Sequence, residues 1–165
     1  MAQGRLSVVC FTGHRQIPRQ HALLLPALLE QQILLLMARG GTVFRAGGAV
    51  GCYMLASLKV LELREQHPAL QLQLMLPCPD QTKGWDEPSR RAHRYLTEHA
   101  DSVICISDRY HSGCMLARDR RLVDGSDLCL AYCAHAGGGT AYTCSYANKK
   151  GVEILNLFDL LSDHE

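Results

Sequence analysis

Glycine-rich turns follow three apolar, strand-like runs of this chain. They are Gly13 after residues 6–12, Gly47-Gly48-Ala49-Val50-Gly51 after residues 42–46, and Gly137-Gly138-Gly139-Thr140 after residues 128–133. Glycine lets the backbone take left-handed angles and brings bare N–H groups close to a ligand, so such turns favour anions where they open helices. Because the carboxyl ends of parallel strands meet at one edge of a sheet, we expect the three turns to converge on one crevice.

Strand-like and helix-like segments alternate along the whole chain. The expected strands cover residues 6–12, 42–46, 70–76, 102–107, 128–133 and 152–155, and the expected helices lie within residues 18–39, 54–65, 87–99, 115–123 and 140–149. Such alternation implies right-handed βαβ crossovers and a parallel sheet that is covered on both sides. We therefore predict one α/β domain over residues 1–165, a Rossmann-like, doubly wound, mostly parallel sheet with helices on both faces.

Charge and composition narrow the possible partners. The 17 Lys and Arg residues nearly balance the 16 Asp and Glu residues, and one Trp and three Phe offer few surfaces on which bases can stack. We therefore expect nucleic acid to be an unlikely partner. The first residues lack a signal-peptide pattern, and the apolar stretch 22–38 is interrupted by Pro26 and by Glu30-Gln31-Gln32, so we expect a cytoplasmic protein that does not enter a membrane.

Eight cysteines raise the question of disulfides or a metal site. No C-x-x-C pair occurs among them, and several lie within apolar strand runs. We interpret most of them as reduced, buried side chains and expect no bound metal and no required cofactor.

The helix expected within residues 18–39 is apolar around more than one face. A helix on one side of a sheet needs only a single apolar stripe, so the additional leucines require cover from the same chain or from a second subunit. We predict a homodimer.

Polar residues near the predicted strand ends are candidates for ligand contacts. Arg15 can place a planar set of donors over a phosphate, and His14 can act as an acid or base near neutral pH, although both could also be ordinary surface residues. Cys114 lies three residues after His111 near a predicted helix start, a setting that can activate a thiol, although a packing role is favoured for it. Arg118, one helical turn further on, is the better candidate for an anion contact. Asp124 either ends its helix or binds a ribose or a base, and Trp85 either packs on the domain or stacks on a base.

Common nucleotide motifs are absent, but a series of segments resembles a known family. The chain has neither a P-loop nor a G-x-G-x-x-G turn. The segments are, in order, Cys10-Phe11-Thr12-Gly13-His14-Arg15, Gly47-Gly48-Ala49, Pro77-Cys78 with Gln81 and Trp85, Ala100-Asp101-Ser102-Val103, Tyr110-x-x-Gly113-Cys114-Met115, Leu122-Val123-Asp124, and Gly138-Gly139-Thr140 with Tyr146-Ala147. Over about residues 8–156 they resemble the YpsA-like branch of the SLOG superfamily, to which the DprA/Smf and LOG proteins also belong. The resemblance implies a Rossmann-like fold that binds nucleotides or nucleotide-derived ligands such as ADP-ribose or NAD-related signals.

Two departures from this pattern bear on function. Tyr53 stands where the YpsA-like motif usually has an acidic residue, and Thr143 stands where the LOG motif has its catalytic glutamate. Without that carboxylate, a LOG-type hydrolysis is not assumed.

The hypothesis that follows is a sensor or regulatory protein whose small-molecule ligand is a nucleotide derivative. The expected ligand- and phosphate-binding residues are Gly13, His14, Arg15, Gly47, Gly48, Gly51, Arg118, Gly138, Gly139 and Thr140, with Gln81, Trp85, Tyr110 and Asp124 as candidates for base or ribose contacts. The alternatives are a hydrolase of N-glycosidic or phosphoribosyl bonds, with His14, Asp124 or Cys114 as catalytic candidates, and single-stranded DNA binding as in DprA-type relatives. Catalysis is the less favoured reading.

Overall fold

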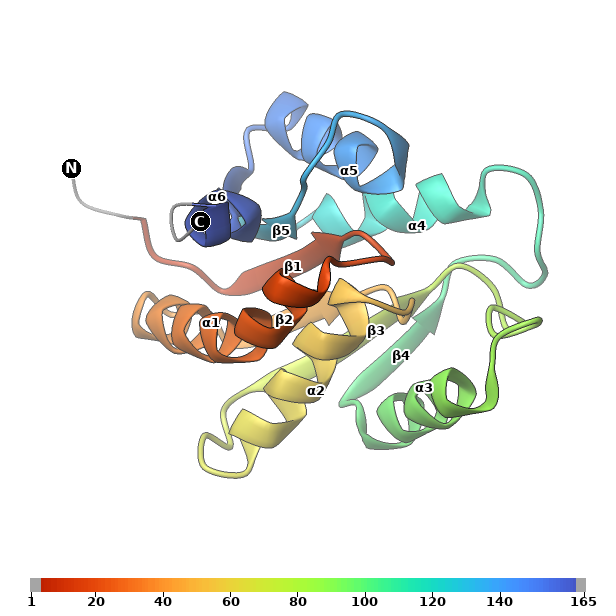
Figure 1. Ribbon diagram of the computed structural model, residues 1–165, viewed down its shortest axis with the longest axis horizontal. Helices are drawn as coiled ribbons and strands as arrows, with labels where there is room; N and C mark the ends of the chain where they lie inside the picture. Colours follow the sequence, from red (N-terminus) through yellow and green to blue (C-terminus); the bar gives the residue numbers. More distant parts are fainter. Residues whose placement is uncertain (1–3, 163–165) are drawn as a thin grey trace.

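The computed structural model describes residues 4–162 and contains one six-stranded sheet (Figure 1). The strands are β1 (Val8–Gly13), β2 (Val43–Ala46), β3 (Gln71–Leu76), β4 (Ser102–Cys105), β5 (Leu128–Tyr132) and β6 (Glu153–Asn156). Their spatial order is β4-β3-β2-β1-β5-β6, and every neighbouring pair is parallel. The predicted fold class, a Rossmann-like α/β sheet, is confirmed, with an all-parallel rather than a mostly parallel sheet.

Six helices connect or follow the strands. They are α1 (Arg19–Ala38), α2 (Cys52–Arg64), α3 (Glu87–His99), α4 (Cys114–Val123), α5 (Gly138–Lys149) and α6 (Leu157–Ser162). Packing contacts link α1 to α2 and α6, and α2 to α3, whereas α4 and α5 pack together on the opposite face of the sheet (Figure 1). Both faces of the central strands are therefore covered.

The continuous apolar runs become the central strands. Val9, Cys10 and Phe11 of β1 have no exposed surface, and every residue of β5 is fully buried beside them. Strands that are buried on both faces need apolar side chains at every position, which is why these runs show no alternation. Strands β2, β3 and β4 lie on one side of β1, and β5 and β6 lie on the other, so the strand order reverses at β1. The loops after β1, β2 and β5 therefore meet at the carboxyl edge of the sheet.

Helix α1 lies against the sheet through one face only. Its Leu25, Leu29, Ile33 and Leu36 are buried. By length and composition alone this helix could cross a membrane, and it is the one helix among residues 4–162 for which that holds. In the fold it is a covering helix, because the buried leucines pack on the sheet core.

The opposite face of α1 carries uncovered leucines. Leu23 is 72% exposed and Leu35 is 53% exposed, and Leu24 and Leu34 are exposed as well. No element within residues 4–162 covers these side chains, and the homodimer remains a prediction. We expect light scattering at high micromolar concentration to give twice the mass of the chain, and Leu23→Glu combined with Leu35→Glu to give the monomer mass, since charges on this face would oppose its burial. A monomer in the unmodified protein would refute the dimer.

Candidate ligand-binding site

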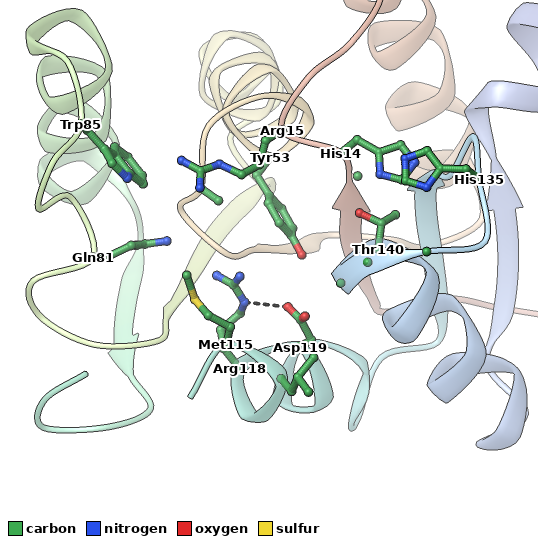
Figure 2. A pocket seen from close by; sticks show the side chains of 16 residues that line it. His14, Arg15, Tyr53, Gln81, Trp85, Met115, Arg118, Asp119, His135 and Thr140 are labelled. Atoms are coloured by element: carbon green, nitrogen blue, oxygen red, sulfur yellow. Dashed lines mark hydrogen bonds and ion pairs between the residues drawn. The ribbon is translucent and has the colours of Figure 1, made fainter. Parts of the chain in front are cut away.

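A pocket of about 430 Å³ opens at the carboxyl edge of the sheet, a volume within the range of small-molecule sites (Figure 2). Segments that are distant in the sequence line it: the end of β1, the start of α2, the loop before α3, the first half of α4, and the β5–α5 turn. The lining residues are Gly13, His14, Arg15, Ala49, Tyr53, Gln81, Trp85, Met115, Leu116, Arg118, Asp119, His135, Gly137, Gly138, Gly139 and Thr140. Most of the sequence-predicted contacts are thus brought together.

A buried ion pair forms the floor of the pocket. Arg118 Nε donates to Asp119 Oδ1 over 2.8 Å, and each residue is only 4% exposed. Arg118 Nη1 donates to the carbonyl of Gly47 over 2.6 Å, and the guanidinium lies over the Tyr53 ring at 5.3 Å from its centroid. Its third nitrogen, Nη2, has no hydrogen-bonding partner in the part of the chain that the structure describes. The pocket therefore contains a rigidly held arginine with one free donor.

The carboxylate of Asp119 lies in a partly desolvated setting. Burial raises the pKa of Asp119 above its ordinary value, and the charge of Arg118 and the hydroxyls of Thr143 and Tyr53 offset this effect only in part. Burial likewise raises the pKa of Tyr53, so its phenol stays protonated near neutral pH. The tyrosine that replaces the family's acidic residue is thus an uncharged wall of the pocket beside Asp119.

Two stacked imidazoles form the wall next to the β5–α5 turn. The rings of His14 and His135 are 4.0 Å apart and nearly parallel, and the N–H of Ala134 donates to His14 Nε2 over 2.9 Å. Burial and the nearby His135 lower the pKa of His14. A neutral ring that accepts at Nε2 carries its proton on Nδ1, so His14 can donate one hydrogen bond.

The opposite end of the pocket combines an aromatic ring with polar side chains. Trp85 is half-buried, packs edge-on against His93, and has the Arg15 guanidinium over its ring at 5.8 Å from the centroid. Gln81 is held in place because its Nε2 donates to the carbonyl of Gly47 over 3.0 Å and its Oε1 lies 3.1 Å from His93 Nε2. Trp85 therefore packs on the domain and also lines the pocket, and stacking of Trp85 on a base stays a prediction.

Gly47, Gly48 and Gly51 of the second glycine turn are not among the residues that line the pocket, and their role as phosphate contacts stays a prediction. A Cβ on Gly47 would overlap the Arg118 guanidinium, one on Gly48 would lie 2.5 Å from Leu76 Cδ2, and one on Gly51 would lie 2.5 Å from the Arg15 carbonyl oxygen. These glycines are needed because neighbouring groups pack directly on their backbone. The turn supports Arg118 and Arg15 from behind, and Ala49 is its one pocket-lining residue.

Three further candidates lie elsewhere. Asp124 ends α4 on the side where β5 begins, and its carboxylate accepts a 2.7 Å hydrogen bond from the Tyr146 hydroxyl, so its helix-ending role is what the structure shows. Cys114 is fully buried at the start of α4, outside the pocket. Tyr110 is exposed and lines a neighbouring hollow of about 280 Å³, which shares Gln81 and Met115 with the main pocket.

Three of the pocket residues that sequence reasoning did not name as contacts carry polar side chains: Tyr53, Asp119 and His135. Asp119 follows Arg118 directly, and a pair of opposite charges inside an otherwise amphipathic helix usually indicates a solvated face. His135 precedes the glycine turn by two residues and carried no signal of its own.

No cluster of three or more potential metal ligands occurs in residues 4–162, and all eight cysteines are unpaired. That the protein binds no zinc stays a prediction. We expect elemental analysis of the purified protein to give far less than one zinc per chain, and a stoichiometric amount would contradict it.

These features define a class: a Rossmann-like α/β protein with a ligand-sized pocket at the carboxyl edge of its sheet, in which a few polar side chains stand among apolar ones. The model of the YpsA family, described as the YspA SLOG family, matches residues 11–156, and the chain belongs to this family. UPF0398 protein BH1768 of Halalkalibacterium halodurans is 33% identical over 139 residues, which cover 82% of this chain and 74% of that protein. A UPF0398 protein of Bacillus thuringiensis strain Al Hakam is 30% identical over 122 residues, and the match spans 66% of its length.

Solved structures share the fold. DNA processing protein A from Helicobacter pylori superposes with a TM-score of 0.62 at 20% identity, covering 91% of this chain and 64% of that one. DprA from Streptococcus pneumoniae gives 0.64 at 16% identity, covering 96% of this chain and 54% of that one, and TM1055 gives 0.58 at 16% identity. The Helicobacter pylori protein is described by its single-stranded DNA binding mode. Our exclusion of nucleic acid as an unlikely partner is therefore wrong, because a near-neutral net charge does not remove a binding mode known in this fold.

Proposed function

We propose that the protein binds a phosphate-bearing, nucleotide-derived ligand in the 430 Å³ pocket and acts as a sensor or regulator. The observation that carries the proposal is the free Nη2 of the buried Arg118, held by Asp119 and by the Gly47 carbonyl so that it faces an open pocket. A preorganised arginine donor binds phosphate with little loss of side-chain entropy.

Other lining residues agree with a phosphate at this place. The Gly137-Gly138-Gly139-Thr140 turn opens α5, and a helix start presents unpaired N–H groups and a positive dipole end. Trp85 and Gln81, at the far end of the pocket, offer a stacking face and an amide for a base (Figure 2). A nucleotide with its phosphate at the start of α5 and its base at Trp85 would span the whole pocket.

Isothermal titration calorimetry with AMP, ADP-ribose, NAD and inorganic phosphate tests this proposal. We expect at least one of the nucleotides to bind in the micromolar range and inorganic phosphate to compete weakly with it. A protein that binds none of the four at millimolar concentration would refute the proposal.

Single-stranded DNA binding is a second candidate, favoured by the fold shared with DNA processing protein A. Arg15 over Trp85 at the pocket rim would supply one charge and one stacking surface. Fluorescence anisotropy with a labelled oligothymidylate separates the two candidates, because DNA binding would weaken steeply with salt while binding of a mononucleotide inside the pocket would weaken little.

Arg15→Ala should weaken ligand binding without affecting the fold. Arg15 is exposed, so its removal leaves no cavity. We expect a roughly 3- to 5-fold loss of AMP affinity, less than for a buried contact, because solvent screens an exposed charge. The melting temperature should stay nearly unchanged. Arg19→Ala, a matched loss of an exposed arginine at the start of α1, should leave both quantities unaltered; a large drop in the melting temperature of Arg15→Ala would show that Arg15 is structural.

We also infer that the protein works in a reducing compartment such as the cytoplasm. Eight unpaired cysteines support this inference, since disulfides form and persist in oxidising surroundings.

A further inference from the structure

The carboxylate of Asp119 has one oxygen, Oδ2, that accepts no hydrogen bond within residues 4–162. Oδ1 accepts the 2.8 Å bond from Arg118 Nε. The hydroxyls of Tyr53 and Thr143 lie near the same carboxylate and lower its pKa. Their hydrogen bonds go to other acceptors: Tyr53 donates to Thr12 Oγ1 over 3.4 Å, and Thr143 donates to the carbonyl of Gly139 over 2.9 Å. In the described residues no donor is hydrogen-bonded to Oδ2, although Asp119 is only 4% exposed and lines the pocket. An ionised carboxylate offers about four acceptor sites, so Oδ2 has capacity for a ligand.

The position of Oδ2 defines which part of a ligand it would meet. A Cβ built on Gly139 would lie 3.5 Å from Oδ2, so this oxygen faces the turn that opens α5. Figure 2 shows the carboxylate of Asp119 between Arg118 and Thr140, with Trp85 and Gln81 at the far side of the pocket. If phosphate binds at the α5 start, the group next to Asp119 is the one joined directly to the phosphate, and in every nucleotide this group is the sugar.

We propose that Asp119 recognises the sugar hydroxyls of the ligand, so that the pocket selects ribose over deoxyribose. This inference rests on the proposed phosphate-ligand function. A hydroxyl is a neutral donor that suits a carboxylate already paired with an arginine, whereas a cationic group would be repelled by Arg118. Buried acceptors reject an analogue that lacks the matching hydroxyl, because the acceptor then loses its water without gaining a partner.

The test compares AMP with 2′-deoxy-AMP and 3′-deoxy-AMP by titration calorimetry. For the unmodified protein we expect AMP to bind about 10-fold or more tightly than at least one deoxy analogue, the effect of one hydrogen bond to a charged group. Asp119→Asn should reduce AMP affinity to that of the deoxy analogue and leave the deoxy analogue within about twofold. Asp159→Asn, a matched change at an exposed aspartate on α6, should leave the preference intact.

Each contrary result has a separate meaning. Equal binding of AMP and both deoxy analogues by the unmodified protein overturns the role of Asp119 and leaves the proposed function standing, and this comparison needs no variant to fold. Loss of AMP, deoxy analogues and inorganic phosphate by the same factor in Asp119→Asn shows that Asp119 only positions Arg118, which also overturns the inference. Absence of binding by AMP and both deoxy analogues overturns the inference, and it refutes the proposed function as well when ADP-ribose, NAD and inorganic phosphate also fail to bind.

Discussion

Replacement of Arg118 by alanine is expected to destabilise the protein by about 3–5 kcal/mol, because it leaves the buried carboxylate of Asp119 without its partner. The same change removes a donor to the Gly47 carbonyl and the guanidinium that lies over Tyr53. It should also lower AMP affinity at least 10-fold, the effect of losing a charged contact to phosphate. Urea unfolding and titration calorimetry measure the two effects.

A double variant separates stability from binding. Arg118→Met with Asp119→Leu replaces the ion pair by apolar side chains, and such replacements of buried pairs are often neutral for stability. We expect the double variant to regain most of the lost unfolding free energy and to remain unable to bind AMP. A double variant as unstable as the single one would show that the Gly47 contact, rather than the unpaired charge, explains the loss; retained binding would remove Arg118 from the site.

The fold was predictable because its strongest signals are local. The runs that became β1 and β5 are apolar at every position, a pattern that buried parallel strands require, and glycine turns mark their carboxyl ends. Strand boundaries were less predictable than the strands themselves. The strand expected over residues 102–107 ends at Cys105, although the N–H groups of Ile106 and Ser107 still donate to the carbonyls of Leu76 and Pro77.

The site was predictable only for residues that directly follow a strand, because the sheet fixes their position. His14, Arg15 and the Gly137–Thr140 turn follow strands directly, so the sheet places them at its carboxyl edge. Asp119 depends instead on how α4 is rotated against α5 and β1, which no spacing in the sequence records. The sequence predicts phosphate contacts at the glycines of the second turn, and in the structure Gly47 lies directly against Arg118 and Gly51 against Arg15. A single sequence cannot distinguish a glycine required by such close packing from one required by a ligand.

The stabilities of two glycine-to-alanine variants, one at Gly51 and one at Gly84, separate the cost of packing from the cost of backbone strain at the second turn. Gly51 has φ of 85°, and a Cβ there would lie 2.5 Å from the Arg15 carbonyl oxygen and 2.6 Å from that of His14. Gly51→Ala therefore combines a backbone conformation that costs an L-residue about 1–3 kcal/mol with an overlap against backbone that costs a similar amount. We expect a loss of about 3 kcal/mol or more in urea unfolding, together with weaker AMP binding, because relief of the overlap displaces the segment that carries His14 and Arg15.

Gly84→Ala is the matched control for this change. Gly84 has φ of 84°, but a Cβ there meets no atom within 4 Å, so only the backbone conformation is penalised. The control should lose about 1–2 kcal/mol, the usual cost of a left-handed alanine, and should lose less than Gly51→Ala. Equal losses of unfolding free energy in the two variants would mean that the segment after β1 moves aside for the added methyl group at position 51 at no energetic cost. The second turn would then not be what holds His14 and Arg15 at the pocket.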